Sequence, residues 1–421
     1  MVTCAFVAHS AADSGAEQNM LSLMSHLTPQ CRPVLVIHED GPIADRARQL
    51  GIPTEVLAGG PVRLVRRTER NPLAVALSVL RLMPSVRRAA HSFKRHHVDV
   101  VVAIGTKAIL YAGPAARLSG ARVVWSLHDR VATDYFSRLV VPVLRFLLPR
   151  LVDGLMVNSR ATLDTVRPGR TPVLVAYPGT TFPPVRRTAD PDLDGDVAEV
   201  LMLGRLTPWK GQDVFLRAFA RAFRGTDTRA SVVGGALFGE TDYEQELVDL
   251  THELGINDRV ELTGHVSDPW PYLERADLLV HASRVPEPFG QVVVQGMWSS
   301  CAVVATTPGG PAEVITDHVD GLLVPVDDED ALARALEELR TDDALRGRLR
   351  RAASVAAARF DAGVTAPPVT RWLAAVVSRG LQPRSVTVNL AGSGGLDKLD
   401  QPGPQQVANS TGPEERSDIT D

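Results

Sequence analysis

Short apolar runs alternate with longer amphipathic stretches along most of the chain, and this alternation is the feature that most constrains the fold. Runs that are apolar at nearly every position are typical of strands buried on both faces, and the stretches between them suit helices that cover those faces. We therefore predict parallel sheets covered by helices. The predicted strands are Val2–Ala8, Val34–His38, Val98–Ile104, Val123–Leu127, Leu155–Val157, Val200–Leu203, Ser231–Val233, Val260–Leu262, Leu278–His281, Val303–Ala305 and Leu322–Pro325.

The alternation pauses between residues 178 and 196, where Pro, Gly, Arg and Asp are frequent, and then starts again. That composition is typical of a linker, and 421 residues are too many for one ordinary core. We predict an α/β fold of two doubly wound Rossmann-like domains facing a central cleft, with ligands at the carboxyl ends of the strands. The predicted segments are a first domain at 1–180, a linker at 181–196, a second domain at 197–360, a last helix at 361–380 and a disordered tail at 381–421.

The composition is that of an ordinary globular protein, with 44% apolar and 22% charged residues. A net charge of -4 argues against a nucleic-acid-binding protein. Cys4, Cys31 and Cys301 lack the spacing of a disulfide framework or a zinc cluster, so we expect buried thiols. Residues 1–10 do not resemble a signal peptide, and no apolar run reaches the roughly 18 residues of a membrane span, so we expect a cytoplasmic protein.

Two cations follow a predicted strand near the start of the second domain. Gly204 ends the strand, Arg205 and Lys210 come next, and a helix is predicted to begin near Gly211. Arginine offers a planar fork of donors, lysine offers a mobile charge, and a helix N-terminus adds aligned amides. This group is therefore suited to bind a diphosphate. The alternative is that both cations lie on the surface without a ligand.

An acidic residue precedes another predicted helix of the second domain. Glu287 follows a strand, and Phe289 and Gly290 start the helix, so the amides of Phe289, Gly290 and Gln291 are unpaired donors of its first turn. We infer that Glu287 accepts hydrogen bonds from sugar hydroxyls while these amides face phosphate. Gln295, two turns along the helix, would reach a ribose. The alternative is that Glu287 only interacts with the helix dipole. The two groups together indicate a sugar-nucleotide enzyme.

Two residues of the first half follow predicted strands and are expected to face the same ligand. His128 leaves a buried strand, and we favour a polar contact with the ligand over a role as a loop cap. Gly15 would let backbone approach a phosphate closely, although no full dinucleotide-binding motif surrounds it. The region 61–97 is locally basic, with apolar residues interleaved. It is either a solvated helix face or a surface for peripheral contact with an anionic membrane or acceptor.

These motifs resemble those of the retaining glycosyltransferases of family four, which have the two-Rossmann GT-B fold. The resemblance covers about residues 1–379 and is strongest in the second half. It rests on motifs in the family's order: Gly204-Arg205 with Lys210-Gly211, Thr263-Gly264-His265-Val266, Ala276-Asp277, Pro286-Glu287-Pro288-Phe289-Gly290, and Gly309-Gly310 with Glu313.

The resemblance implies a role for each matching residue. Arg205 and Lys210 would bind the donor diphosphate and stabilise the leaving nucleotide, and Glu287 would hold the donor sugar. His128 would contact sugar and phosphate. The remaining contacts would come from Gly15 and Gly204 at the diphosphate, backbone near Val266 at the base, and the amides of Phe289, Gly290 and Gln291. The first domain would face the acceptor, the second would bind the nucleotide sugar, and the last helix would cross back to the first.

The chain departs from the family at Gln295, where the family has a second glutamate. An amide oxygen is a weaker acceptor than a carboxylate, and losing a charge-assisted hydrogen bond costs about 1–2 kcal/mol. We therefore expect weaker or altered nucleotide preference, or a donor with a deoxyribose such as a dTDP-sugar.

The predicted activity is a retaining, metal-independent transfer of a hexose from a UDP- or GDP-type sugar to a small-molecule or lipid-linked acceptor. It would serve glycoconjugate, polysaccharide or glycosylated natural-product biosynthesis. The donor is a substrate, and neither a cofactor nor a metal is expected. Three alternatives stay open: a catalytically weak sugar-nucleotide-binding subunit, a sugar-nucleotide epimerase on the same fold, and a phosphorylase, for which no pyridoxal lysine can be assigned.

Overall fold

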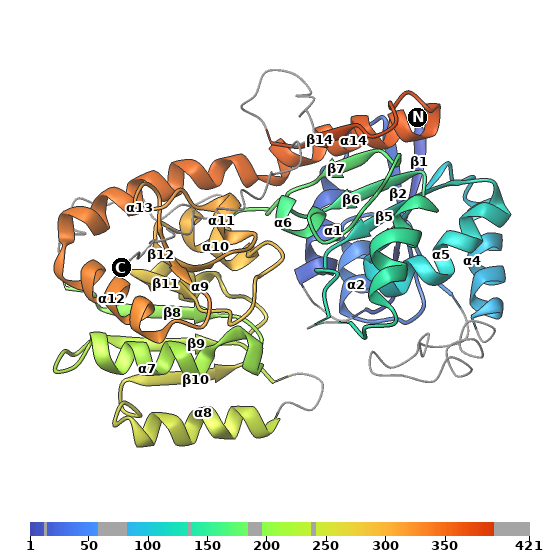
Figure 1. The fold of residues 1–421 in the computed structure, drawn as a ribbon. Coiled ribbons are helices and arrows are strands. Elements are labelled where there is room, and N and C mark those ends of the chain that lie inside the picture. The colour runs from blue at the N-terminus through green and yellow to red at the C-terminus, as the bar shows by residue number, and fades with distance from the viewer. Residues whose placement is uncertain (12–14, 58–81, 134–135, 184–195, 237–240, 391–421) are drawn as a thin grey trace, which may run out of the picture.

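The structure, a computed structural model, describes residues 1–11, 15–57, 82–133, 136–183, 196–236 and 241–390. In these residues the chain forms two parallel β-sheets with helices on both faces (Figure 1). Each sheet and its helices form one Rossmann-like domain. The two domains predicted from the strand pattern are therefore present.

The first sheet has eight strands in the order β14-β7-β6-β5-β4-β1-β2-β3. Side chains of β1 (Val2–Ala8) alternate between its faces. Ala5 and Val7 pack with α4 (Met83–Arg95) and α5 (Gly105–Ser119), whereas Cys4 and Phe6 pack with α1 (Gly15–Ser25) and α2 (Pro42–Gln49). The other strands are β2 (Cys31–Ile37), β3 (Thr54–Val56), β4 (Val100–Ile104), β5 (Arg122–Leu127), β6 (Gly154–Val157), β7 (Val173–Val175) and β14 (Val386–Val388).

The second sheet has six strands in the order β10-β9-β8-β11-β12-β13. They are β8 (Glu199–Leu203), β9 (Arg229–Val233), β10 (Val260–Gly264), β11 (Leu278–His281), β12 (Ala302–Thr307) and β13 (Leu322–Pro325). One face packs with α7 (Gln212–Ala222), α8 (Thr241–Glu253) and α12 (Glu329–Thr341), and the other with α9 (Trp270–Arg275), α10 (Gln291–Trp298) and α13 (Asp343–Ala357). Strand order reverses between β8 and β11, which is where ligands bind in such sheets.

Aromatic side chains join the two domains. The ring of Tyr177, after β7, lies 6.0 Å from that of Phe289 and 6.1 Å from that of Phe360. Phe182 stacks on Trp298 of α10 with ring centroids 3.9 Å apart. These contacts make the apolar core continuous across the domain boundary.

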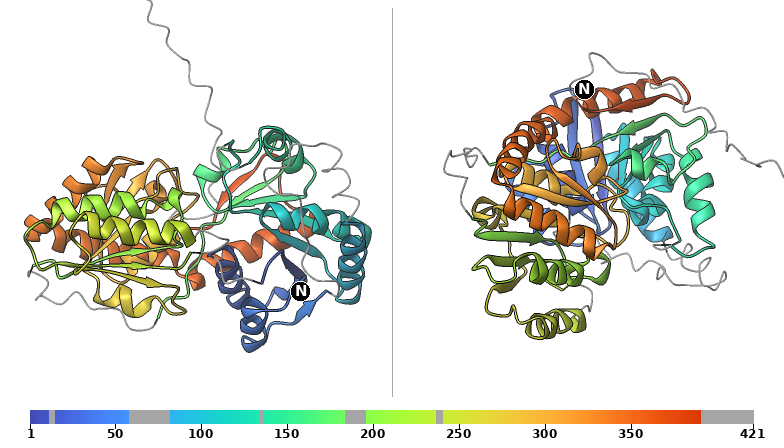
Figure 2. Two further views of the ribbon diagram at one scale, coloured as in Figure 1. Left: turned by 90° about the horizontal axis from the view of Figure 1, so that it is seen from below. Right: turned by 60° about the vertical axis from the view of Figure 1, so that its left-hand side comes forward.

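The last helix, α14 (Ala362–Ser378), runs from the second domain onto the first (Figure 2). Its Trp372 and Leu373 are buried with Cys4 and Phe6 of β1, on the face that α1 also covers. The Thr370 hydroxyl accepts a hydrogen bond from the amide of Thr28 at 3.3 Å. Residues of α14 are therefore part of the core of the first domain.

The prediction that the tail is disordered from residue 381 is wrong for its first ten residues. Val386–Val388 form β14, which pairs in parallel with β7 at the edge of the first sheet. The buried Asn389 side chain accepts a hydrogen bond from the amide of Tyr177 at 2.8 Å and donates to its carbonyl at 3.1 Å. A strand added to an existing edge needs few apolar residues, so composition did not reveal it. Residues 391–421 lie outside the described residues.

Two further sequence predictions are only partly covered. Residues 184–195 of the predicted linker and 58–81 of the basic region lie outside the described residues. Within α4, Val86 and Phe93 are buried, whereas Arg87 and Arg88 are exposed, so this part of the basic region is a solvated helix face. The three cysteines are buried, and none of them forms a disulfide within the described residues. None of the helices in the described ranges is long and apolar enough to cross a membrane.

Candidate active site

Two helix N-termini, one from each domain, face each other. Gly290 has a φ of 94°, which suits glycine, and directs the chain into α10 at Gln291. Gly15 starts α1, and a Cβ placed on it would lie 3.6 Å from Oε1 of Gln291. The structure thus brings together two residues that are 276 positions apart (291 minus 15). Both helices direct the positive end of their dipoles to the space between them.

Glu287 lies beside α10 in a polar cluster. Its Oε2 accepts hydrogen bonds from Nζ of Lys210 at 2.8 Å and from Oγ of Ser283 at 3.0 Å. The Nε2 atom of His281 is 3.4 Å from the same oxygen, and Nδ1 of His281 is 3.2 Å from Oγ1 of Thr306. Each of these contacts to Glu287 involves Oε2, so among the described residues Oε1 keeps its acceptor positions for a ligand.

Neighbouring groups keep the Glu287 carboxyl ionised. Burial raises the pKa of the carboxyl, but the ammonium of Lys210 and the hydrogen bond from His281 outweigh burial. The pKa therefore lies well below its usual range. The residue is a carboxylate at neutral pH, which makes it an acceptor and not an acid.

The loop that carries Glu287 is held by a second loop, after β12. The amide of Gly310 donates to the carbonyl of Glu287 at 2.8 Å. A Cβ on Gly309 would lie 2.8 Å from that same carbonyl oxygen, so the close approach requires glycine. The Gly309-Gly310 motif therefore positions Glu287 through backbone contact.

Arg205 and Lys210 lie on the turn between β8 and α7, which includes η4 (Pro208–Lys210). The Arg205 carbonyl accepts from Nε2 of the buried Gln212 at 2.9 Å, which ties this turn to α7. The amide of Gly204 donates a hydrogen bond to the carbonyl of Val233 at 2.9 Å, so the ends of β8 and β9 stay together beside the turn. Val266 follows the end of β10, on the far side of β9, and is partly buried against the core.

His128 follows β5 on the first domain. Its Nε2 is 2.9 Å from Oγ of Ser126, and its carbonyl accepts from Nδ2 of Asn158 at 3.2 Å. Burial lowers the pKa of His128 to about 4, so the ring is neutral at pH 7. Two residues later, Nη1 of Arg130 is 3.4 Å from the carbonyl of Pro286, next to Glu287. The loops that carry His128 and Glu287 therefore meet at the domain boundary.

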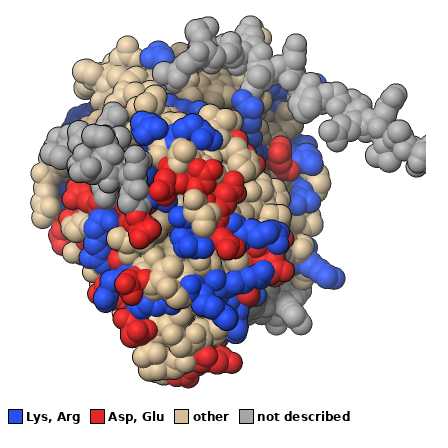
Figure 3. Space-filling model, turned by 90° about the vertical axis from the view of Figure 1, so that its left-hand side faces the viewer, with Lys and Arg blue, Asp and Glu red and all other residues tan. Residues whose placement is uncertain are grey.

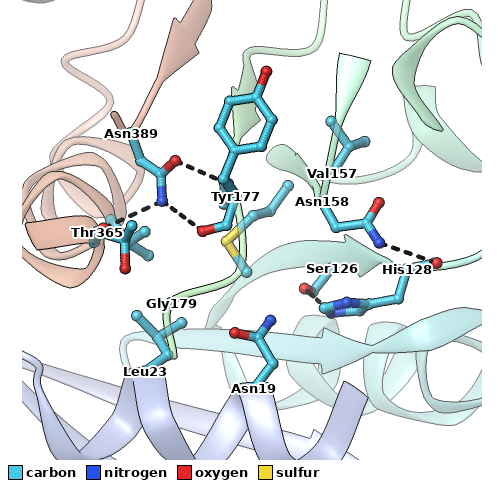
Figure 4. Close-up of a pocket in the computed structure, with 13 residues that line it drawn as sticks. Asn19, Leu23, Ser126, His128, Val157, Asn158, Tyr177, Gly179, Thr365 and Asn389 are labelled. Carbon is cyan, nitrogen blue, oxygen red and sulfur yellow. Dashed lines mark hydrogen bonds between the residues drawn. The ribbon is translucent and has the colours of Figure 1, made fainter. Parts of the chain in front are cut away.

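A small polar pocket lies behind His128 (Figure 4). Asn19 of α1 and Asn158 after β6 point into it together with His128, and Asn389 closes the side next to α14. Its volume of about 20 Å³ is room for a water molecule and not for a sugar. The hydrogen bond with Ser126 orients the His128 ring, and the pocket is too small to hold the donor.

Glu313 connects the domains from α11 (Pro311–Val314). Its carboxylate accepts from the amides of Arg160 at 2.8 Å and Ala161 at 2.7 Å, which are the first residues of α6 (Arg160–Leu163). The same carboxylate accepts from the Tyr177 hydroxyl at 2.6 Å. A side chain of the second domain thus accepts hydrogen bonds from the first amides of a helix in the first domain.

Sequence reasoning missed several residues of this region. His281 was predicted only as the end of the strand Leu278–His281, and Ser283 was not considered, although both polar residues precede Glu287 by no more than six positions. Glu313 was recognised only as a motif residue, and its partners across the boundary follow from the fold. Asn389 lay in a segment that was predicted to be disordered.

Two family models together match both domains. The model of glycosyl transferases group 1 matches residues 188–355, and that of glycosyltransferase family 4 matches residues 14–181. The structure is similar to the solved structure of Anabaena HepE in complex with UDP and glucose, with a TM-score of 0.73 and 25% sequence identity. The alignment covers 89% of the present chain and 100% of the HepE chain.

Two curated relatives are similar over part of their length. The first is the N-acetylgalactosamine-N,N'-diacetylbacillosaminyl-diphospho-undecaprenol 4-alpha-N-acetylgalactosaminyltransferase of Campylobacter jejuni, 29% identical over 54% of this chain and 61% of the relative. The second is the D-inositol 3-phosphate glycosyltransferase of Stackebrandtia nassauensis, 33% identical over 64% of this chain and 60% of the relative. This chain therefore spans less than two thirds of either relative.

The fold and the matches define a GT-B protein, with two Rossmann-like domains that meet at the candidate site. The chain belongs to glycosyltransferase family 4, the glycosyl transferases group 1.

Proposed function

We propose that this protein transfers a sugar from a nucleoside diphosphate sugar to an acceptor hydroxyl with retention of anomeric configuration, and that the nucleotide is UDP. The observation that carries the proposal is the Glu287 carboxylate, held by Lys210 beside the N-terminus of α10. A carboxylate that stays ionised and a cation that stays beside it suit a ligand with hydroxyls at one end and phosphates at the other. HepE, solved with UDP and with UDP-glucose, supports the choice of nucleotide.

Glu287 holds the donor sugar. Lys210, Ser283 and His281 fix Oε2, so Oε1 accepts from two ring hydroxyls without the carboxylate having to reorient. A fixed acceptor loses little conformational entropy on binding.

The diphosphate lies between the two helix N-termini. Lys210 has three donors and uses one on Glu287, so the others reach phosphate oxygens. Arg205 adds a planar fork, and the amides of Gly290 and Gln291 add the dipole of α10. These groups supply the positive charge that a metal ion supplies in other enzymes, and activity is expected to persist in EDTA. The uracil lies against backbone near Val266.

In the reaction, the bond between the anomeric carbon and the diphosphate oxygen breaks, and its electron pair leaves with UDP. Lys210, Arg205 and the helix dipole stabilise the negative charge that grows on the diphosphate. The acceptor oxygen forms its new bond on the face that UDP leaves, and its proton passes to a phosphate oxygen. Neutral His128 contributes a polar contact to the sugar and phosphate.

The test is incubation of the purified protein with UDP-glucose and other UDP- and GDP-sugars, followed by proton NMR for the sugar and phosphorus NMR for the nucleotide. Slow transfer to water serves as the readout, so no acceptor is needed. The expected result is release of UDP with the α-anomer formed first, insensitive to EDTA and lost in Glu287→Gln. First appearance of the β-anomer contradicts retention, an epimerised nucleotide sugar contradicts transfer, and binding without turnover indicates the weak binding subunit that Gln295 suggests.

A further inference from the structure

An unusual surface lies on the first domain, away from the candidate site. Residues 136–152 contain three arginines and no acidic residue. Five of the large apolar side chains in this segment are exposed by 46% to 68%: Leu139, Val143, Phe146, Leu147 and Leu151. We call these five residues the apolar patch. Figures 1 and 2 show the segment, in blue-green, on the outside of the first domain.

The patch is built on a helical segment that is apolar on both sides. The segment includes η1 (Val143–Leu147) and η2 (Leu148–Arg150). Val141, Leu144 and Val152 face inward and are buried, so the exposed side is not needed for the core. The segment winds as a π-helix over Val143–Leu147 and a 3-10 helix over Leu148–Arg150, and all five patch residues fall between positions 139 and 151. Large apolar side chains that are exposed together on one short segment are typical of an interaction site.

Arginines lie near the patch, although one of them, Arg117, is paired with Asp153 at 3.3 Å. Arg138 and Arg150 are exposed within the segment, and Arg117 of α5 donates to the Leu151 carbonyl at 3.1 Å. Arg150 also donates to the carbonyl of Arg167 at 2.7 Å. The outer face of the second domain differs, because acidic and basic side chains are interspersed there (Figure 3).

A cationic hollow adjoins the patch. It has a volume of about 240 Å³ and is lined by Arg122, Arg170, Arg379 and Asp153 together with apolar residues of α14 and the chain after it. Asp153 pairs with Arg122 at 3.1 Å, which leaves the hollow net positive. The Thr171 hydroxyl donates to the carbonyl of the buried Pro149 at 2.8 Å, so the loop that carries Arg170 contacts the buried side of the segment that carries the patch.

From this combination we propose that the first domain docks on the surface of an anionic lipid bilayer. The apolar patch enters the interfacial region, and the hollow with Arg170 and Arg379 takes lipid phosphate. Apolar side chains beside a cluster of arginines are the combination that binds anionic membranes, because each cation adds attraction to the apolar burial. The proposal does not rest on the proposed reaction, since none of these residues belongs to the candidate active site.

The patch is coupled to that site through Arg145 on its inner side. Nη2 of Arg145 donates to the Val131 carbonyl at 3.0 Å, and Nε donates to the Thr165 carbonyl at 2.9 Å. Val131 is three residues after His128. A docked patch therefore fixes the loop that carries His128 relative to the bilayer, and the first domain would meet its acceptor at the lipid surface.

The test is sedimentation of the full chain with vesicles of pure phosphatidylcholine and of phosphatidylcholine with one third phosphatidylglycerol. The wild type is expected to sediment with the second kind only, and less so as salt rises. Phe146→Glu/Leu147→Glu and Arg170→Glu/Arg379→Glu are each expected to weaken binding at least about tenfold, because apolar burial or charge attraction is lost. Matched controls on the second domain are Val355→Glu, at a side chain that is 73% exposed, and the exposed Arg348→Glu.

If the glutamate variants fail to fold, tryptophan fluorescence provides a second measurement. Phe146→Trp keeps an aromatic side chain, and its fluorescence is expected to shift to the blue only with anionic vesicles. Failure of the wild type to sediment, or equal binding by the patch variants and the controls, overturns the proposal. A third result also overturns the proposal: the wild type forms a dimer, Phe146→Glu/Leu147→Glu converts it to a monomer, and neither binds vesicles. The patch would then be a contact between copies of the chain.

Discussion

Lys210 and Glu287 form an ion pair with 2.8 Å between Nζ and Oε2, although 77 positions separate them in the chain. The two side chains are 18% and 13% exposed, so water screens the pair only in part. Lys210 follows β8 and Glu287 follows β11, and these two strands are neighbours in the sheet. The pair therefore results from the strand order of the second domain.

The pair is expected to contribute more to stability than a surface ion pair. In a double-mutant cycle with Lys210→Met and Glu287→Gln, we expect a coupling free energy of about 1–3 kcal/mol from urea unfolding, because either single change leaves a partly buried charge without its partner. The matched control is the exposed Arg221–Asp330 pair, for which we expect about 0.5 kcal/mol or less. Equal coupling in the two cycles would show that the Lys210–Glu287 pair is an ordinary surface contact.

Loss of the Glu313 carboxylate is expected to loosen the contact between the domains. Glu313→Ala leaves the amides of Arg160 and Ala161 without their acceptor and removes the partner of the Tyr177 hydroxyl. We expect a loss of about 1–3 kcal/mol in stability and faster hydrogen exchange in the peptide that contains α6. Tyr177→Phe removes one of the three bonds and should have a smaller effect. Glu337→Gln, at an exposed position of α12, is the control. If Glu337→Gln lowers stability as much as Glu313→Ala does, Glu313 does not hold the domains together.

The buried His38 is expected to make the protein sensitive to acid. Burial lowers its pKa to about 4, with a contribution from the charge of Arg88. The unfolded chain takes up a proton near the ordinary value of about 6.5, whereas the folded one does not until about pH 4. The contribution of neutral His38 to the free energy of unfolding is thus fully present above pH 6.5 and is lost as the pH drops towards 4. His38→Leu removes this titration, so its melting temperature should fall less between pH 7 and 4.5 than that of the wild type. If the melting temperatures of the wild type and His38→Leu fall equally between pH 7 and 4.5, His38 is not the source of the acid sensitivity.

A carboxylate at position 295 is expected to strengthen nucleotide binding. Gln295 lies on α10 one turn after Gln291 and is partly exposed. If it faces the ribose, Gln295→Glu should tighten binding of UDP by about tenfold, because a charge-assisted hydrogen bond replaces a neutral one. Binding of dTDP should gain less, since its sugar lacks one hydroxyl. Equal affinities in wild type and variant would place Gln295 away from the ribose. Gln245→Glu on the exposed side of α8 is the control.

The strands could be predicted because each is a continuous apolar run, and β1, β11 and β13 have the predicted bounds. The short strands β3, β7 and β14 were missed, since three residues give no periodicity. Residues of the site were predicted one at a time from strand ends and helix starts. Their contacts, such as Gly15 with Gln291 or Glu313 with α6, depend on how the two domains meet, and no local pattern contains that information.

The most direct test of the central claim is calorimetric titration of the wild type and Arg205→Ala with UDP, with Arg217→Ala on the exposed side of α7 as the control. The account predicts that the wild type and the control bind UDP equally. It also predicts that Arg205→Ala binds about tenfold or more weakly, because a hydrogen-bonded charge on the diphosphate is lost. If the wild type binds no UDP, or if Arg205→Ala binds as well as the control, the placement of the donor diphosphate beside Arg205 and Lys210 is contradicted.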